Sequence, residues 1–275
     1  MTCVELGIAD VVVSVRSECP ALTLSPLLGE FLICQDADER NLELVVEAGP
    51  PPPVQMVNPL ESAHIRGART PDGFWFERVR GAMWAAPDFS RCRAWTGRPD
   101  DLSRPFNGRP WLMFALWGYL AQRGGVFLHG ATCVLEGRHV LLLADSQVGK
   151  STLARLSAEA GYTALTDEYP AVTCAGARIR AHGLPWPGRQ GPPAPASGEL
   201  AAVFFLRQAP ANALEQLAPP EIGRRLMRNA RFFGWDPATT LPALESLDRI
   251  ARAVPGYEAA FTPSPQAVEM LVQVL

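Results

Sequence analysis

One short segment, residues 144–151, constrains the fold of this chain more than any other. It reads Ala-Asp-Ser-Gln-Val-Gly-Lys-Ser, and its Lys150 is the only lysine among the 25 basic residues. Arginine serves as well as lysine at most surface positions, but a site that needs a compact, strongly hydrated ammonium group does not tolerate the exchange. Because the only lysine stands in a phosphate-loop pattern, the sequence predicts an anion-binding loop between a strand and a helix.

The residues around this segment have the order that a phosphate loop requires. The predicted elements are strands over 126–135 and 139–143, a tight turn over 136–138, a helix over 151–160 and a strand over 162–166. The helix is expected to stop at Gly161, and the last strand ends in the acidic pair Asp167 and Glu168. Strand, loop, helix and strand in this order predict an α/β domain.

The rest of the chain divides into two parts. Residues 1–105 are predicted to form a β-rich N-terminal part, with strands over 11–15, 42–46 and 74–79. Residues 106–275 are predicted to form the core around the phosphate loop. Its first helix, 110–123, is apolar nearly all round and is therefore expected to be buried, with a dimer or membrane-surface role as the alternative. The remaining predicted elements are a strand over 200–206 and helices over 220–233, 241–254 and 265–275.

Composition excludes several classes of protein. A hydrophobic share of 48% argues against global disorder. A net charge of -3 argues against the excess of positive charge that is typical of nucleic-acid-binding proteins. The longest apolar stretch, 111–121, is too short to cross a bilayer, and the N-terminus has no signal-peptide core. The sequence therefore predicts a soluble, cytoplasmic protein with neither nucleic-acid nor membrane partners.

The cysteines and histidines do not form a metal-binding pattern. The six cysteines never occur as Cys-x-x-Cys, and Cys133 and Cys174 stand in apolar runs, where cysteine is usually a small buried hydrophobe. The four histidines are too few to complete a metal site with these cysteines at recognised spacings.

The loop and the acidic pair together predict phosphate chemistry. Backbone N–H groups at a helix start bind anions, Lys150 would reach the β- and γ-phosphates, and the Ser151 hydroxyl would hold Mg²⁺. Asp167 and Glu168 can supply an acid near the metal and a base for the attacking hydroxyl. The alternative for this acidic pair is a surface turn. The predicted nucleotide-binding residues are Asp145, Ser146, Gln147, Val148, Gly149, Lys150, Ser151 and Thr152.

Three segments of the sequence resemble those of a known protein family. The segments Leu128-His-Gly-Ala, the phosphate loop, and Gly161-Tyr-Thr-Ala-Leu-Thr-Asp-Glu168 look like the catalytic core of HPr kinase/phosphorylase. Members of that family read His-Gly, a hairpin, Gly-Asp-Ser-Gly-Val-Gly-Lys-Ser, a helix, Gly-His and Asp-Asp. The match runs without gaps from His129 to Glu168. The resemblance implies an α/β fold with a P-loop, HPr-kinase/PEP-carboxykinase-like core.

The resemblance also implies roles for individual residues. It makes Lys150, Asp167, Glu168 and His129 the catalytic residues, with Lys150 on the phosphates. Ser151 and Asp167 would be the metal ligands, and either Asp167 or Glu168 the general base. His129 matches the family histidine that hydrogen-bonds an active-site acid; its alternative is a structural role that caps the strand inside the core.

The implied activity is transfer of the γ-phosphoryl group of ATP, with Mg²⁺, to a hydroxyl. Segments such as Gly183-Leu-Pro-Trp-Pro-Gly188 resemble a wider group of HPr-kinase-like proteins, which includes lasso-peptide kinases. This predicts a Ser or Thr hydroxyl of a precursor peptide as acceptor, and a homo-oligomer is compatible with it. The alternatives are a small-molecule kinase, such as one for free serine, and a nucleotide-binding sensor without turnover.

The chain departs from the family in ways that bear on these alternatives. Ala144 and Gln147 replace loop glycines, and the acidic metal-ligand segment that follows the core in the family is not recognisable around 178–188. The N-terminal part differs from that of the bifunctional enzyme, so HPr itself is not expected as substrate. The donor, ATP rather than GTP or pyrophosphate, stays open.

Two further groups of residues are weaker candidates. His182 and Trp186 stand where a substrate-facing loop is expected, although core packing is the usual role of such a tryptophan. The predicted helix 220–233 carries four arginines near one face, which could grip an acidic leader peptide or a carboxylate, or simply be solvated. These arginines are Arg224, Arg225, Arg228 and Arg231.

Overall fold

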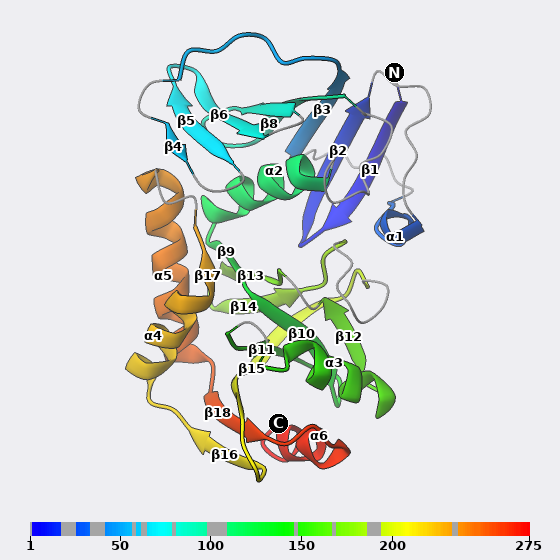
Figure 1. Ribbon diagram of the computed structural model, residues 1–275, viewed down its shortest axis with the longest axis vertical. Helices are drawn as coiled ribbons and strands as arrows, with labels where there is room; N and C mark the ends of the chain where they lie inside the picture. The colour runs from blue at the N-terminus through cyan, green and yellow to red at the C-terminus, as the bar shows by residue number, and fades with distance from the viewer. Residues whose placement is uncertain are drawn as a thin grey trace. The chain divides into compact units, whose positions relative to one another are not determined.

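Two mixed β-sheets organise the chain (Figure 1). The computed structural model describes residues 2–17, 26–33, 42–56, 59–61, 65–78, 81–97, 109–145, 148–166, 169–185, 194–232 and 236–275. They form two compact units, the first of Met1–Gln122 with Phe233–Thr240 and the second of Arg123–Phe232 with Leu241–Leu275. The described part is therefore a mixed α/β protein whose N-terminal part is rich in strands, in agreement with the coarse prediction of fold class.

The first unit contains an eight-stranded sheet. Its order is β1 (Thr2–Ile8), β2 (Val11–Ser17), β3 (Leu42–Ala48), β8 (Arg91–Thr96), β7 (Gly81–Ala85), β6 (Gly73–Arg78), β5 (Arg66–Thr70) and β4 (Leu60–Glu61). A short helix, α1 (Pro26–Gly29), follows β2 in the chain. In β3, Leu42, Leu44 and Val46 are buried while the residues between them are not, because successive side chains of a strand point to opposite faces.

Helix α2 (Arg109–Ala121) packs on the apolar face of this sheet. The Phe114 ring stacks on Phe76 of β6, with ring centroids 6.1 Å apart. Gly118 leaves space for the ring of Phe89, which a Cβ at this position would overlap. The helix is buried, as its composition predicts. It belongs to the first unit, so the structure divides the chain after residue 122 where the sequence analysis places the division at 105.

The second unit contains a ten-stranded sheet. The main order is β12 (Thr163–Thr166), β10 (Gly130–Leu135), β11 (Arg138–Leu143), β15 (Ser197–Gln208), β14 (Arg178–His182), β13 (Ala171–Ala175), β9 (Gly125–Leu128) and β17 (Ala230–Arg231). Strand β18 (Gly256–Phe261) pairs with β15, and β16 (Ala213–Gln216) pairs with β18. Strands β11, β15 and β18 are parallel, so their carboxyl ends lie at the same edge of the sheet.

Two hydrophobic clusters cover the two faces of this sheet. Helices α3 (Lys150–Glu159) and α6 (Pro265–Val272) contribute to one, and α4 (Pro219–Asn229) and α5 (Pro237–Ala253) to the other. Strand β11 supplies Val140 and Leu142 to the first cluster and Leu141 and Leu143 to the second. This strand is therefore buried on both faces, which explains its continuous apolar sequence.

The predicted strand over 126–135 is in fact two strands that separate at His129. Strand β9 pairs with β13 and β17, whereas β10 pairs with β11 and β12. The backbone N–H of His129 donates to the carbonyl of Asn229 at 2.7 Å, outside both ladders. Hydrophobic pattern alone does not separate one long strand from two consecutive strands with different partners.

The predicted helix over 220–233 is also shorter in the structure. Helix α4 ends at Asn229, and residues 230 and 231 form β17, which pairs with β9. Arg231 is therefore not on the helix face that the sequence analysis assigns to four arginines. Pairing with Leu128 and Phe127 draws this segment into the sheet, a tertiary effect that helix periodicity does not contain.

The other predictions about composition can be compared directly with the structure. Cys133 and Cys174 are buried free thiols, as expected. In the described part of the chain, no group of three or more His, Cys, Asp or Glu side chains is placed to hold a metal ion. Among the described helices, none combines the length and the apolar character needed to span a membrane.

Candidate functional site

The phosphate-loop segment lies at the carboxyl end of β11 and leads directly into α3. This is the edge of the sheet where the carboxyl ends of the parallel strands meet, which is the usual ligand position in open α/β sheets. Of the loop residues, Ala144, Asp145, Val148 and Gly149 are described, and α3 continues with Lys150, Ser151 and Thr152. The candidates Ser146 and Gln147 lie outside the described residues.

Lys150 is buried, with 7% of its surface exposed. Its Nζ donates hydrogen bonds to the carbonyl oxygens of Ala144 at 2.7 Å and Asp145 at 3.0 Å. Burial lowers the pKa of Lys150, the charge of Asp145 raises this pKa, and the charge of Arg231 lowers it, with a net decrease. No carboxylate forms an ion pair with Lys150 among the described residues, so its charge is held by backbone dipoles and is open to an anion.

Gly149 precedes α3 in a backbone conformation that favours glycine, with φ at 112°. A Cβ at this position would lie 2.8 Å from Cζ of Phe261, at the end of β18, so glycine is also required for space. The N-cap residue of α3, Gly149, has no side chain that could cap the helix, and the first turn has no acidic residue. The first N–H groups of a helix lack intrahelical partners and carry the positive end of its dipole, so this helix start suits an anion.

His129 lies at the same edge of the sheet as the loop. Gly130, the next residue, pairs with Leu143, the last residue of β11 before the loop. The His129 ring is tilted against the Tyr169 ring with centroids 6.1 Å apart. Register therefore brings His129 and the start of the phosphate loop to one edge of the sheet.

The acidic pair Asp167 and Glu168 lies outside the described residues. The preceding residue, Thr166, ends β12 and pairs with Thr132 of β10. Both threonine hydroxyls are buried, and neither has a hydrogen-bond partner in the described part of the chain. Two hydroxyl groups are therefore buried in the sheet, and one of them belongs to the residue that precedes Asp167 in the sequence.

Arg231 is a further candidate site residue, which lies on a strand and not on the predicted helix. Its guanidinium acts on the charge of Lys150, and β17 sits beside β9, which ends just before His129. A second cation therefore lies close to the lysine. The helical spacing of the four arginines conceals this position, and only the pairing of β17 with β9 reveals it.

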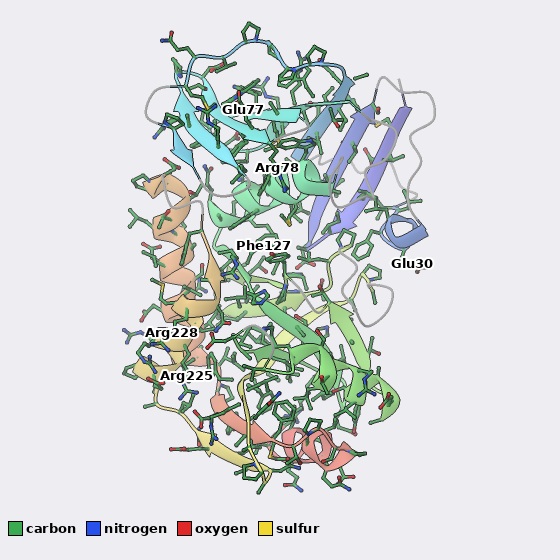
Figure 2. All side chains as sticks on the ribbon, in the orientation of Figure 1. Glu30, Glu77, Arg78, Phe127, Arg225 and Arg228 are labelled. Carbon is green, nitrogen blue, oxygen red and sulfur yellow. The ribbon has the colours of Figure 1, made fainter. Side chains whose placement is uncertain are left out.

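The three arginines that remain on α4 are mostly neutralised by acids. Arg224 and Arg225 donate to Glu221, and Arg225 also pairs with Glu258 of β18 at 2.8 Å. Hydrogen bonds from both arginines lower the pKa of Glu221 to about 2. Arg225 and Arg228 are labelled on α4 in Figure 2, and Arg228 is exposed to solvent. This face is thus largely an ion-pair network.

His182 is not a substrate-facing residue. It is fully buried in β14, and its ring nitrogens lie 2.8 Å from the hydroxyls of Thr173 and Ser197. Its role is to join β14 to its neighbours inside the unit. Trp186 lies outside the described residues.

Comparisons with known proteins give distant likenesses to solved structures only. No protein-family model matches the chain, and no curated protein matches its sequence. Among solved structures, the chain is similar to the HPr(Ser) kinase/phosphatase from Coxiella burnetii, with a TM-score of 0.33 and 11% sequence identity. That match covers 54% of this chain and 93% of the other. Because this TM-score is low, membership of the family stays a prediction from the sequence motifs.

Proposed function

We propose that this protein is a phosphotransferase that uses a nucleoside triphosphate, with ATP as the expected donor. The observation that carries the proposal is the state of Lys150. The only lysine of the chain is buried at the start of α3, bonded to two loop carbonyls, and it has no acidic partner among the described residues. A buried cation held by backbone carbonyls, next to the first N–H groups of a helix, suits phosphate.

The described residues fit the phosphates. Without a side chain at Gly149, the backbone can approach an anion bound at the start of α3. The Nζ of Lys150 would then move from the loop carbonyls to phosphate oxygens. Arg231 adds a second positive charge near this place. Positioning and charge stabilisation of this kind account for most of the catalysis of phosphoryl transfer.

The site also suits a magnesium ion. Ser151 stands in the first turn of α3, and the hydroxyls of Thr132 and Thr166 are buried on β10 and β12, where Thr166 precedes Asp167 in the sequence. In this proposal Ser151 and Asp167 would hold the ion, which neutralises charge on the phosphates when bound. Asp167 or Glu168 would take the proton of the acceptor hydroxyl, and His129 would orient the acid that does so.

The proposed acceptor is the hydroxyl of a Ser or Thr residue in a ribosomally made precursor peptide of the lasso type. This part of the proposal rests on the motifs after the core, which resemble those of HPr-kinase-like proteins. A cytoplasmic location and assembly into a homo-oligomer belong to the same proposal.

The test is mass spectrometry of candidate hydroxyl acceptors after incubation with the protein, Mg²⁺ and ATP. We expect a gain of one phosphate group on a Ser or Thr residue, lost in Lys150→Met. The matched control is Arg155→Met, which removes an exposed charge from α3 whose partner is Glu159. Equal transfer by the wild type and Lys150→Met would overturn the proposal.

A second pair of variants separates catalysis from binding. Asp167→Asn and Glu168→Gln keep the size of each side chain but remove its charge and basicity. We expect the variant of the base to bind nucleotide and lose transfer. If nucleotide binds to the wild type but no acceptor, peptide or small molecule, is ever phosphorylated, the sensor interpretation replaces the enzyme.

A further inference from the structure

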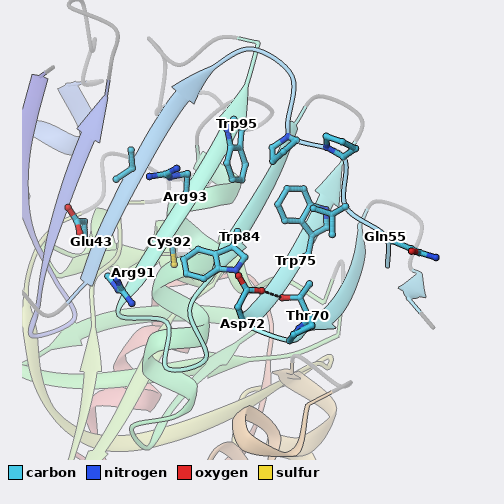
Figure 3. A pocket seen from close by; sticks show the side chains of 15 residues that line it. Glu43, Gln55, Thr70, Asp72, Trp75, Trp84, Arg91, Cys92, Arg93 and Trp95 are labelled. Atoms are coloured by element: carbon cyan, nitrogen blue, oxygen red, sulfur yellow. Dashed lines mark hydrogen bonds between the residues drawn. The ribbon is translucent and has the colours of Figure 1, made fainter. Parts of the chain in front are cut away.

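The first unit contains a cavity of about 690 Å³ on the face of its sheet opposite α2 (Figure 3). Three tryptophans, Trp75, Trp84 and Trp95, line it together with Arg91, Arg93 and Asp72. Every lining residue belongs to the first unit, whereas the phosphate loop belongs to the second. This volume falls within the range of known ligand sites.

Strand alternation explains why these side chains gather. Trp75 of β6 is opposite Trp84 of β7, and Trp84 is opposite Arg93 of β8. These three side chains form one row across three strands. They lie on the face of the sheet opposite to Phe74 and Phe76, whose side chains point toward α2. Trp95 lies two residues beyond Arg93 on the same face, and its ring centroid is 5.4 Å from that of Trp75.

Four charged side chains line the cavity, and two of them, Arg91 and Asp72, form no ion pair among the described residues. Arg93 pairs with Glu47 at 3.1 Å, and Glu43 pairs with Arg16 at 2.9 Å. Arg91 faces Glu43 across the ladder, yet it is exposed and forms no ion pair among the described residues. Since Glu43 is already engaged, Arg91 is the cation of this cavity that is left for a ligand.

A second polar group of the cavity also lacks a partner. The indole N–H of Trp84 is buried, and no acceptor bonds to it within the described ranges. The nearby carboxylate of Asp72 accepts from the hydroxyl of Thr70 at 2.9 Å. A buried donor without an acceptor is destabilising, and a ligand carbonyl or carboxylate would supply the missing acceptor.

The opposite wall indicates what kind of ligand fits. It consists of Pro52, Pro53, Val54 and Gln55, an irregular segment of the chain's own backbone outside any strand. Aromatic walls commonly accept extended, proline-containing peptide, because such a segment has little conformational freedom to lose. The chain thus already places one such segment against this group of indoles.

We propose that this cavity binds an extended peptide segment of a partner, which presents an acidic side chain to Arg91 and an apolar side chain to the indoles. A backbone carbonyl of the same segment would accept from the Trp84 N–H. The guanidinium of Arg91 favours an acidic residue of the peptide, and the indoles bury the apolar side chain beside it. The inference goes beyond the proposed function and stands without it, because it concerns binding to the first unit.

The test uses the whole protein and three end-capped peptides labelled with a fluorophore, followed by fluorescence anisotropy. One peptide alternates Glu and Leu, its twin has Gln in place of Glu, and a third has Lys in place of Glu. We expect the Glu peptide to bind at least tenfold more tightly than its Gln twin, and the Lys peptide not to bind. We expect Arg91→Gln to remove this preference and Arg138→Gln, which removes an exposed charge in the second unit, to keep it.

Other outcomes would overturn the inference. These are equal binding of the Glu and Gln peptides, an unchanged preference in Arg91→Gln, or no binding of any peptide. Displacement by an uncharged oligosaccharide together with no effect of Arg91→Gln would identify a sugar site instead. Lys150→Met serves as a separate control, because peptide binding should be unchanged in it even where phosphate transfer is lost, so the two proposals fail independently.

Discussion

At the scale of single residues, Gly149 shows how little freedom the loop has. Its φ of 112° favours glycine, and Phe261 stands where a Cβ would be. We expect Gly149→Ala to destabilise the protein by about 1–3 kcal/mol and to weaken nucleotide binding, because both the backbone and the neighbouring ring must shift. Thermal unfolding and calorimetric titration with ATP measure the two effects.

The matched control for this variant is Gly161→Ala. Gly161 also has a positive φ, 89°, but nothing lies within 4 Å of the position of its Cβ. It should therefore lose stability through backbone strain alone and keep its affinity for nucleotide. Equal losses of affinity in both variants would show that the contact with Phe261 has no part in shaping the loop.

Arg231 allows a prediction about pH. Its charge lowers the pKa of Lys150, and nucleotide binds to the charged ammonium, so affinity should fall as the pH rises through that pKa. In Arg231→Gln we expect about tenfold weaker binding, because one charge near the phosphates is lost. The alkaline fall in affinity should move to higher pH, because the neighbouring positive charge no longer lowers the pKa of Lys150.

Arg228→Gln is the control, since Arg228 lies on α4 and is exposed. Its affinity and its pH profile should match those of the wild type. A profile for Arg231→Gln that does not move would contradict a direct electrostatic contact between Arg231 and the site.

At the scale of elements, local signals were readable in the sequence and long-range pairing was not. Helix α3 and the turn at 136–138 follow from nearby residues, and the structure has them where predicted, with Gly137 at φ 73°. The break at His129 and the change from α4 to β17 depend on partners distant in sequence. The hairpin of β13 and β14 was not predicted either.

The same limit applies to the candidate site. Lys150 could be found because its type and position are both unusual, and His129 because a motif contains it. Arg231 was hidden among 24 arginines, since neither residue type nor helical spacing distinguishes the one that reaches the site. What sets it apart is the pairing of two-residue β17 with β9, which no local pattern records.

The ion-pair network of α4 leads to a prediction about acid stability. The arginines lower the pKa of Glu221 from 4.5 to about 2, so its contribution to stability is present above pH 4.5 and is lost as the pH falls toward 2. We expect Glu221→Gln to have a weaker dependence of stability on pH in this window. Urea unfolding at several pH values measures it, and Glu269→Gln, at an exposed position on α6, should behave like the wild type.

At the scale of the whole molecule, the two units give different optical signals. The tryptophans that the structure describes, at 75, 84, 95, 111 and 117, all belong to the first unit, so tryptophan fluorescence mainly follows its unfolding. Phe114 is 7% exposed and stacks on Phe76. We expect Phe114→Ala to destabilise the first unit by about 3–5 kcal/mol and to lower the transition seen by fluorescence.

Nucleotide binding measured below that transition should be unchanged in Phe114→Ala, because the phosphate loop belongs to the second unit. Leu32→Ala is the control, since Leu32 is 43% exposed and its truncation leaves no cavity. Loss of nucleotide affinity in Phe114→Ala at low temperature would mean that the state of the first unit governs the site.

The first unit is built from two segments that are far apart in the sequence, and this has a consequence for folding during synthesis. This unit includes residues 233–240, where Asp236, 2% exposed, forms an ion pair with Arg69 of β5 at 3.3 Å. A ribosome releases a chain from its N-terminus, and domains generally fold in that order. Here the N-terminal unit is complete only after residue 240 has been translated, when most of the second unit has already left the ribosome, so a chaperone that shields the nascent first sheet would be needed for longest by the unit that emerges first.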